Sequence, residues 1–193
     1  RRTPVALRNP RLSIALLIFP HQLFADHPAM AAEPDRVVMV EDPLFFGDPQ
    51  YPMVMHKQKL WVHRATMAQY AARLRADGLH VEIASHRREK GMITRVGNGL
   101  AQDGVTKIVL ADPVDHTAMK RLAAAADGAD IALSVYDTPY FINSEGDNAA
   151  WAEGRKRWFM AEYYKYQRKR LDVMMDGDAP QGGQWRFDGD NRK

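Results

Sequence analysis

The sequence predicts an α/β fold in which a mostly parallel sheet of five strands is covered by helices on both faces. Two observations support this prediction. Short, unbroken apolar runs recur in the part of the chain before residue 137, and segments with helical spacing of apolar residues lie between them. This alternation is typical of parallel sheets, because their strands are buried on both faces and are joined by crossover helices.

The five expected strands are short apolar runs, and three of them stop at residues unable to continue a buried strand. Pro20 stops the first run, and Pro43 and Pro113 lie just beyond the second and the fourth. Proline cannot donate a hydrogen bond to a sheet ladder, so it marks the end of a central strand. The predicted strands are residues 14–19, 36–40, 81–84, 107–110 and 131–135.

Helical spacing predicts three helices between these strands. The apolar stripe of the first of them consists of Leu60, Met67, Ala71 and Leu74. The second is weakened by Gly97 and Gly99, and the third is rich in alanine. The predicted helices are residues 56–76, 92–101 and 116–126, and a loop rich in Pro, Phe and Gly is expected at 44–55.

Composition and length allow one domain with a sizeable core. The 193 residues are 46% hydrophobic and 26% charged, as in ordinary globular proteins. The absence of cysteine excludes disulfides and thiolate metal sites and suits a reducing, cytoplasmic compartment. The longest apolar run, IALLIF, is far shorter than the ~20 residues of a membrane span. We expect a trimmed or disordered N-terminus at 1–10, an α/β domain at 11–140 and a helical linker at 141–193.

The segment 154–175 is the most unusual part of the chain. Between Arg155 and Arg170 it has seven Lys or Arg residues against one acid, Glu162, with five aromatic residues interleaved. No Gly or Pro interrupts this stretch, which predicts a helix of about five or six turns. The stripe expected to be buried consists of Met160, Tyr164, Gln167, Leu171 and Met174.

Two interpretations of this basic helix remain open. Charge runs are usually solvated faces, so the aromatic residues would pack while the basic groups meet water. Alternatively, the helix docks on a partner domain or on nucleic acid. The residues after Met175 favour docking, because Trp185 and Phe187 in a polar frame suit an extended arm laid across another surface. The net charge of +3 is mild, so any contact with a polyanion would be local.

No common catalytic or nucleotide-binding motif is present. The chain has no GxGxxG after its first strand, no GxxxxGK[ST], no GxSxG and no HExxH. The candidates are instead polar residues at the carboxyl ends of strands, where open parallel sheets bind ligands. His21 and Gln22 follow the first strand, and Glu41 and Asp42 follow the second. They either contact a ligand, such as a ribose or ribityl hydroxyl, or serve only as polar groups of a loop.

His56, Lys59 and His63 form a second group of candidates on one face of the first predicted helix. His56 and His63 are about 10 Å apart at 1.5 Å per residue, which is too far to chelate one metal ion. An anion or a ring ligand near the helix N-terminus suits Lys59 and the free N–H groups there. A histidine that faces a neighbouring loop is an equally good interpretation.

Three segments together resemble one protein family. HKQKLWVHRATMAQYAARL, preceded by VEDPLFF, and GRKRWFMAEYYKYQRKRLDVMMDGDAPQGGQWRFDGDNRK are similar to photolyase-related proteins of the iron–sulfur bacterial cryptochrome and photolyase group. FPHQLF stands where many members have Gly-Asp-Gln-Leu. The resemblance spans residues 12–193 and departs from the family at His21, which replaces an acidic residue, and in a longer loop after Glu41.

This resemblance implies a Rossmann-like domain of the photolyase N-terminal type, followed by a helical linker. Such a domain can hold an antenna chromophore, a ribityllumazine in several members. Full-length members resemble DNA photolyases, lyases that repair lesions such as six-four photoproducts by light-driven electron transfer from reduced flavin. The antenna contacts implied by residue matching are Pro20, His21, Gln22, Glu41, His56, Lys59 and His63.

The same resemblance implies the partners. We expect a monomer that is not catalytic alone, docks on the C-terminal FAD domain of its own protein and meets DNA through the full-length protein. FAD and an iron–sulfur cluster are expected only in that C-terminal part. The residues expected at the docking surface or on DNA are Arg157, Trp158, Tyr163, Lys165, Arg168, Trp185 and Phe187. The alternatives are a blue-light photoreceptor without repair and a stand-alone module for a nucleotide-like ligand or a partner.

Overall fold

The computed structural model describes residues 13–87 and 91–186, and the chain divides into two compact units, 1–142 and 143–193. The strands of the first unit are β1 (Ser13–Ile18), β2 (Arg36–Val40), β3 (Val81–Ala84), β4 (Val105–Ala111) and β5 (Ala132–Tyr136). Its helices are the 3-10 turn η1 (Pro28–Ala32), α1 (Pro43–Phe46), α2 (Lys57–Ala76), α3 (Met92–Gln102) and α4 (His116–Gly128). No helix in the described residues combines the length and the apolar content that crossing a bilayer requires.

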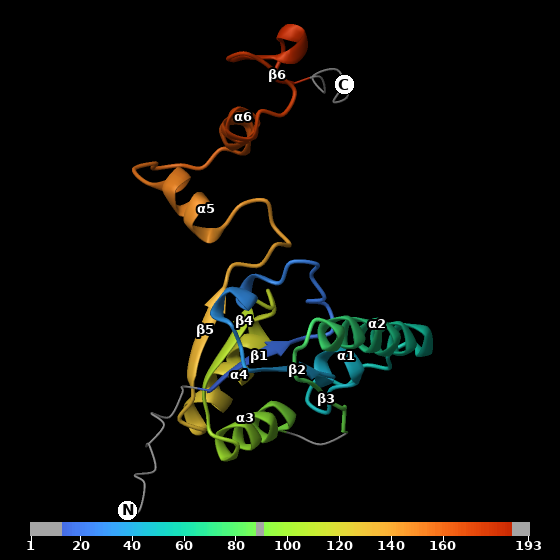
Figure 1. The fold of residues 1–193 in the computed structure, drawn as a ribbon. Helices are drawn as coiled ribbons and strands as arrows, with labels where there is room; N and C mark the ends of the chain where they lie inside the picture. The colour runs from blue at the N-terminus through green and yellow to red at the C-terminus, as the bar shows by residue number, and fades with distance from the viewer. Residues whose placement is uncertain (1–12, 88–90, 187–193) are drawn as a thin grey trace, which may run out of the picture. The chain divides into compact units, whose positions relative to one another are not determined.

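The five strands form one parallel sheet in the order β3-β2-β1-β4-β5 (Figure 1). The chain builds outward from β1 to β3 and then returns to add β4 on the other side of β1. The carboxyl ends of all strands therefore lie at one edge, and the order reverses at the boundary between β1 and β4. Ligands of open α/β sheets bind outside such a switch point. The predicted fold class is confirmed.

Each face of the sheet has its own apolar core because successive residues of a strand point to opposite faces. Leu17 of β1 packs with α3 and α4, whereas Leu16 and Ile18 pack with α2 and η1. Gly97 explains the tight packing of α3 on α4. A side-chain carbon at this position would lie 3.3 Å from the carbonyl oxygen of Ala125, so a larger residue would push the helices apart.

The stretch expected to be a loop after β2 contains the short helix α1. Asp42 is its N-cap, since a carboxylate oxygen accepts a hydrogen bond from the N–H of Leu44 at 2.9 Å. Pro43 occupies the first helical position, where its missing N–H costs nothing. The helix therefore forms although only four residues separate Asp42 from Gly47.

The second unit contains shorter elements than the sequence predicts. They are α5 (Glu145–Ala152), α6 (Met160–Leu171), the strands β6 (Met175–Asp176) and β7 (Ala179–Pro180), and the 3-10 turn η2 (Gln181–Gly183). The prediction of one helix from 155 to about 175 is wrong. Gly154, with φ +70°, ends the preceding helix, and Arg155 donates a hydrogen bond to the carbonyl of Trp151 at 2.7 Å. The residues after Gly154 therefore terminate α5 instead of starting α6.

The predicted buried stripe of α6 is also wrong. Met160 is 78% exposed, and Tyr164, Leu171 and Met174 are exposed as well. The packed face is a different one, because Tyr163 and Tyr166 form the ring contacts with the indole of Trp151 in α5. Periodicity alone could not choose between these faces, since both carry aromatic residues at helical spacing.

Candidate functional site

Gln22 joins the ends of β1 and β4 at the switch point of the sheet. Its side-chain oxygen accepts from the N–H of Phe19 at 3.2 Å. Its amide nitrogen donates to the carbonyl oxygens of Ala111 and Asp112, at 2.8 and 3.1 Å. Gln22 is 0% exposed, and both amide hydrogens are used on the backbone. Its predicted contact with a ligand stays a prediction, but its observed partners are all within the protein.

His21, the neighbour of Gln22, lies between two aromatic rings. Its ring stacks on Phe45 with centroids 4.7 Å apart and on Tyr140 at 5.9 Å. Nε2 lies 3.0 Å from the carbonyl oxygen of Pro113, and because a carbonyl only accepts, Nε2 carries the hydrogen. Nδ1 is buried without a partner. Burial lowers the pKa of His21, against the opposing effects of Pro113 and Asp115.

His63 reaches the same aromatic ring from α2. Its imidazole contacts the edge of Phe45 with centroids 6.0 Å apart, so Phe45 touches both histidines. Nε2 of His63 is buried without a partner. Burial lowers the pKa of His63, and the positive charges of Lys59 and His21 lower it further. The structure therefore brings together two imidazoles with lowered pKa values, each with a buried unpartnered nitrogen, at the carboxyl edge of the sheet.

Glu41 is engaged by a neighbour from α2. Arg64 binds both carboxylate oxygens, at 2.8 and 3.0 Å, and the N–H of His86 donates to the second at 2.8 Å. Burial alone would raise the pKa of Glu41, but the hydrogen bonds from Arg64 and His86 outweigh it and hold the pKa below its usual value. Arg64 also lies over the ring of Phe46, 5.5 Å from the centroid.

The other predicted antenna contacts are placed differently. Pro20 is buried next to His21. His56 is exposed and caps α2, because its Nδ1 accepts from the N–H of Gln58 at 3.2 Å. Lys59 is exposed on the first turns of α2. Of the predicted group, the structure thus brings together Pro20, His21, Gln22 and His63.

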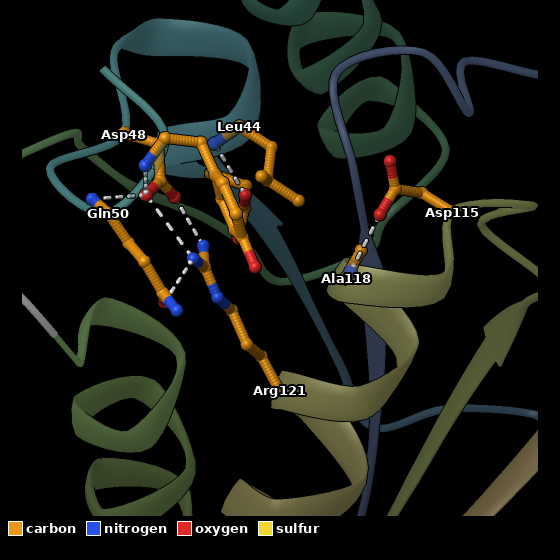
Figure 2. A network of polar contacts seen from close by, with 8 residues as sticks. Leu44, Asp48, Gln50, Asp115, Ala118 and Arg121 are labelled. Atoms are coloured by element: carbon orange, nitrogen blue, oxygen red, sulfur yellow. Dashed lines mark hydrogen bonds and ion pairs between the residues drawn. The ribbon is translucent and has the colours of Figure 1, made fainter.

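A second polar network follows β2 and was missed by the sequence reasoning (Figure 2). Arg121 of α4 binds both carboxylate oxygens of Asp48 and also donates to the side-chain oxygen of Gln50 at 3.1 Å. Asp48 further accepts from the N–H groups of Gln50 and Tyr51, at 2.8 and 3.1 Å. The hydrogen bond from Arg121 holds the pKa of Asp48 below its usual value.

Asp42, in contrast, keeps one oxygen without a partner. It is 0% exposed, and Oδ2 makes no hydrogen bond. Burial raises the pKa of Asp42 to about 6, although the N–H of Leu44 and the charge of Arg121 act in the opposite direction. The only sequence signal for this region was the Asp-Pro pair, which is typical of a helix start. Nothing in the sequence pairs Asp48 with Arg121, 73 positions away.

The predicted docking residues lie in the second unit. The Tyr163 hydroxyl accepts from Asn143 at 2.5 Å and bonds to Asn148, and Lys165 pairs with Glu162 at 3.0 Å. Trp158 is 71% exposed. Arg157 is exposed too. Phe187 lies outside the described residues.

Two of these residues differ from expectation. Arg168 is buried, not solvated, because it donates to the carbonyls of Val173 and Met174. Trp185 lies 5.2 Å from the Arg168 guanidinium and 5.7 Å from the Lys169 ammonium, measured to the ring centroid. Trp185 therefore folds back on α6 instead of extending over another surface.

Comparison with known families identifies the chain. The model of the deoxyribodipyrimidine photo-lyase-related protein family matches residues 16–193, which include both units. The chain belongs to this family. The two histidines, the Glu41–Arg64 pair and the exposed aromatic residues of the second unit are therefore features of a member of this family.

Two relatives differ in how much of them the chain covers. It is 28% identical over 184 residues to the uncharacterized protein R852 of Acanthamoeba polyphaga mimivirus, and the match covers 92% of both chains. It is 26% identical over 141 residues to a (6-4) photolyase of Agrobacterium fabrum, with 72% of this chain and 28% of that protein covered. The matched region thus makes up nearly all of one relative and little more than a quarter of the other.

Proposed function

We propose that this chain is the α/β domain and linker of a flavoprotein that repairs six-four or related pyrimidine photoproducts in DNA with light. The observation that carries this proposal is the family match over residues 16–193, supported by the likeness to a (6-4) photolyase. The catalytic flavin would belong to another part of the protein, since the chain matches only 28% of that photolyase.

The carboxyl edge of the sheet is the proposed place for an antenna chromophore, a ribityllumazine or a similar flat ring. When bound, such a group absorbs near-ultraviolet light and passes the excitation to a flavin. His21 and His63 fit it, because Nδ1 of His21 and Nε2 of His63 are buried ring nitrogens without partners that polar atoms of a ligand would satisfy. Gln22 fits less well, since both amide hydrogens already bind the backbone. Glu41 would not touch the ligand itself, because its carboxylate binds Arg64 and holds that guanidinium in place.

The second unit is the proposed docking surface for the flavin-binding part. An apolar hollow of this unit is lined by Trp151, Trp158, Phe159, Met160 and Tyr163. Three of these side chains are more than half exposed, which is unusual for large apolar residues gathered on one surface. A helical partner with an apolar face would cover them.

The test is a repair assay on the protein as its gene encodes it. An oligonucleotide with a six-four photoproduct is illuminated with blue light, with and without reduction of the flavin, and the loss of the lesion is counted. Light-dependent repair together with bound flavin is the expected result. Bound flavin without repair would support the photoreceptor instead, and the absence of both flavin and repair would overturn the proposal.

A second candidate is a separate subunit that binds its partner in trans. The observation that favours it is R852, because this region is almost the whole of that protein. The 193-residue chain would then bind a separately produced helical flavoprotein. Sedimentation of a mixture of the two chains measures this, and Trp158→Ala should weaken the complex, whereas Trp61→Ala, an exposed tryptophan of the first unit, should not.

A further inference from the structure

A cavity of about 220 Å³ lies within the first unit, between the segment after β2, the start of α3 and the middle of α4. Pockets for drug-sized ligands measure about 300–1,000 Å³, so this cavity suits a smaller molecule. Its walls include Asp42, the Asp48–Arg121 pair and the first residues of α3. None of these residues belongs to the cluster around His21 and His63.

One wall of the cavity offers an unused acceptor. Asp42 is 0% exposed and lines the cavity, and its Oδ2 has no hydrogen-bond partner. A buried carboxylate oxygen without a partner is costly, so it calls for a donor from a ligand or from water. Its other oxygen is used on the N–H of Leu44, which fixes the side chain in place.

Another wall of the cavity is formed by the N-terminus of α3. The first N–H groups of α3, at Met92, Ile93 and Thr94, have no partner within the helix. The N-cap of α3 is Gly91, which provides no side-chain cap. A ligand acceptor at this end of the cavity would meet both the N–H groups and the positive end of the helix dipole.

The charges of the cavity disfavour an ionic ligand. Asp48 and Arg121 neutralise one another in a bidentate pair. The carboxyl of Asp42 repels an anion, while the N-terminus of α3 repels a cation. A neutral ligand that both donates and accepts hydrogen bonds is repelled neither by Asp42 nor by the N-terminus of α3.

The remaining walls are apolar. Pro43, Pro49, Met92, Ile93 and Ala124 present carbon atoms to the cavity. A sugar has hydroxyls on its edge and C–H groups on its faces, and each hydroxyl can donate to a carboxylate and accept from a backbone N–H. We infer that this cavity is a binding site for a small neutral sugar, with hydroxyls hydrogen-bonded to Asp42 and to the N-terminus of α3. The site does not depend on the proposed repair function.

The test is a nitrogen–proton NMR titration of the 193-residue chain with D-ribose. Saturable shifts of the amide signals of Met92, Ile93 and Thr94 are expected. Asp42→Asn keeps an oxygen for the cap of α1 but replaces the free acceptor with a donor, so the affinity should fall about tenfold. Asp115→Asn is the matched control, because Asp115 caps α4 outside the cavity and ribose binding should be unchanged.

A second variant keeps the test decisive if Asp42→Asn does not fold. Ala124 is exposed on α4, so Ala124→Leu should fold while filling the cavity, and it should abolish the shifts. Inorganic phosphate and ethylammonium are the charged probes. Saturable binding of either one in place of ribose would overturn the inference. So would the absence of saturable shifts with D-ribose, which would mean that water alone satisfies Asp42.

Discussion

The two units differ in how far they bury their large apolar side chains. In the first unit, Leu16, Leu17 and Ile18 are fully buried in the sheet, and helices cover both faces. In the second unit, Trp158 and Met160 are 71% and 78% exposed, and the packed aromatic group centres on Trp151. The first unit therefore carries its own core, whereas the second presents apolar surface that a partner could cover.

Their polar groups differ in a related way. In the first unit, buried polar side chains connect strands and helices that are far apart in sequence, as Gln22 does between β1 and β4. In the second unit, the basic groups mostly bond to near neighbours, as Arg168 does to Val173 and Met174. Removal of a side chain that joins elements far apart in sequence should therefore lower the stability of the fold more than removal of a local contact.

The largest difference is expected from truncation of matched apolar residues. Leu17→Ala leaves a cavity in a dense core and should lower the free energy of unfolding by about 2–5 kcal/mol. Met160→Ala in the second unit should change it by no more than about 0.5 kcal/mol. Urea unfolding followed by circular dichroism measures both. Equal losses would show that the second unit has a core comparable to that of the first.

The second largest loss of stability is expected when the Gln22 side chain, which joins the ends of β1 and β4, is removed. Gln22→Ala deprives the N–H of Phe19 and the carbonyls of Ala111 and Asp112 of a partner. The free energy of unfolding should fall by about 1–3 kcal/mol, the usual cost of a buried unsatisfied group. Gln184→Ala, at an exposed position of the second unit, is the control and should leave stability unchanged. A loss in both variants would contradict the special position of Gln22.

A pH effect of similar or smaller size is expected from Asp42. Its folded pKa of about 6 lies above its ordinary value of 3.8, so the folded chain holds the proton more tightly than the unfolded chain. The stabilising contribution is full below the ordinary value and is lost as the pH rises through about 6. Between the two limits the wild type should lose about 3 kcal/mol relative to Asp42→Asn. Parallel stability curves for the two proteins would contradict this.

The smallest effect is expected at the end of the second unit. Trp185→Ala removes the ring that lies against Arg168 and Lys169. A loss of about 0.5–1 kcal/mol corresponds to roughly two- to fivefold faster trypsin cleavage after these residues, if cleavage follows local opening. Trp158→Ala should leave the cleavage rate unchanged, because the 71% exposed indole of Trp158 takes no part in the contact between Trp185, Arg168 and Lys169. Equal rates for wild type and Trp185→Ala would show that the contact adds nothing.

Much of the first unit could be predicted because its signals are local. Short apolar runs predicted all five strands, three of them closed by Pro or by carboxylates, and the stripe of Met67, Ala71 and Leu74 predicted the buried face of α2. The second unit was predicted less well. Its aromatic residues fit helical stripes on more than one face, and the packing against Trp151 selects a face that the spacing leaves open.

In the candidate site, too, local features could be predicted from the sequence, whereas long-range contacts could not. The order of residues along the chain was enough to place His21, Gln22 and Glu41 after buried strands, because a strand end is a local event. The partners of these side chains could not be read from the order, since Gln22 bonds to a carbonyl 89 positions away and Glu41 to a guanidinium 23 positions away. Which polar groups are used up and which, like Oδ2 of Asp42, are left over depends on the sheet order β3-β2-β1-β4-β5, and that order arises from long-range packing of the strands.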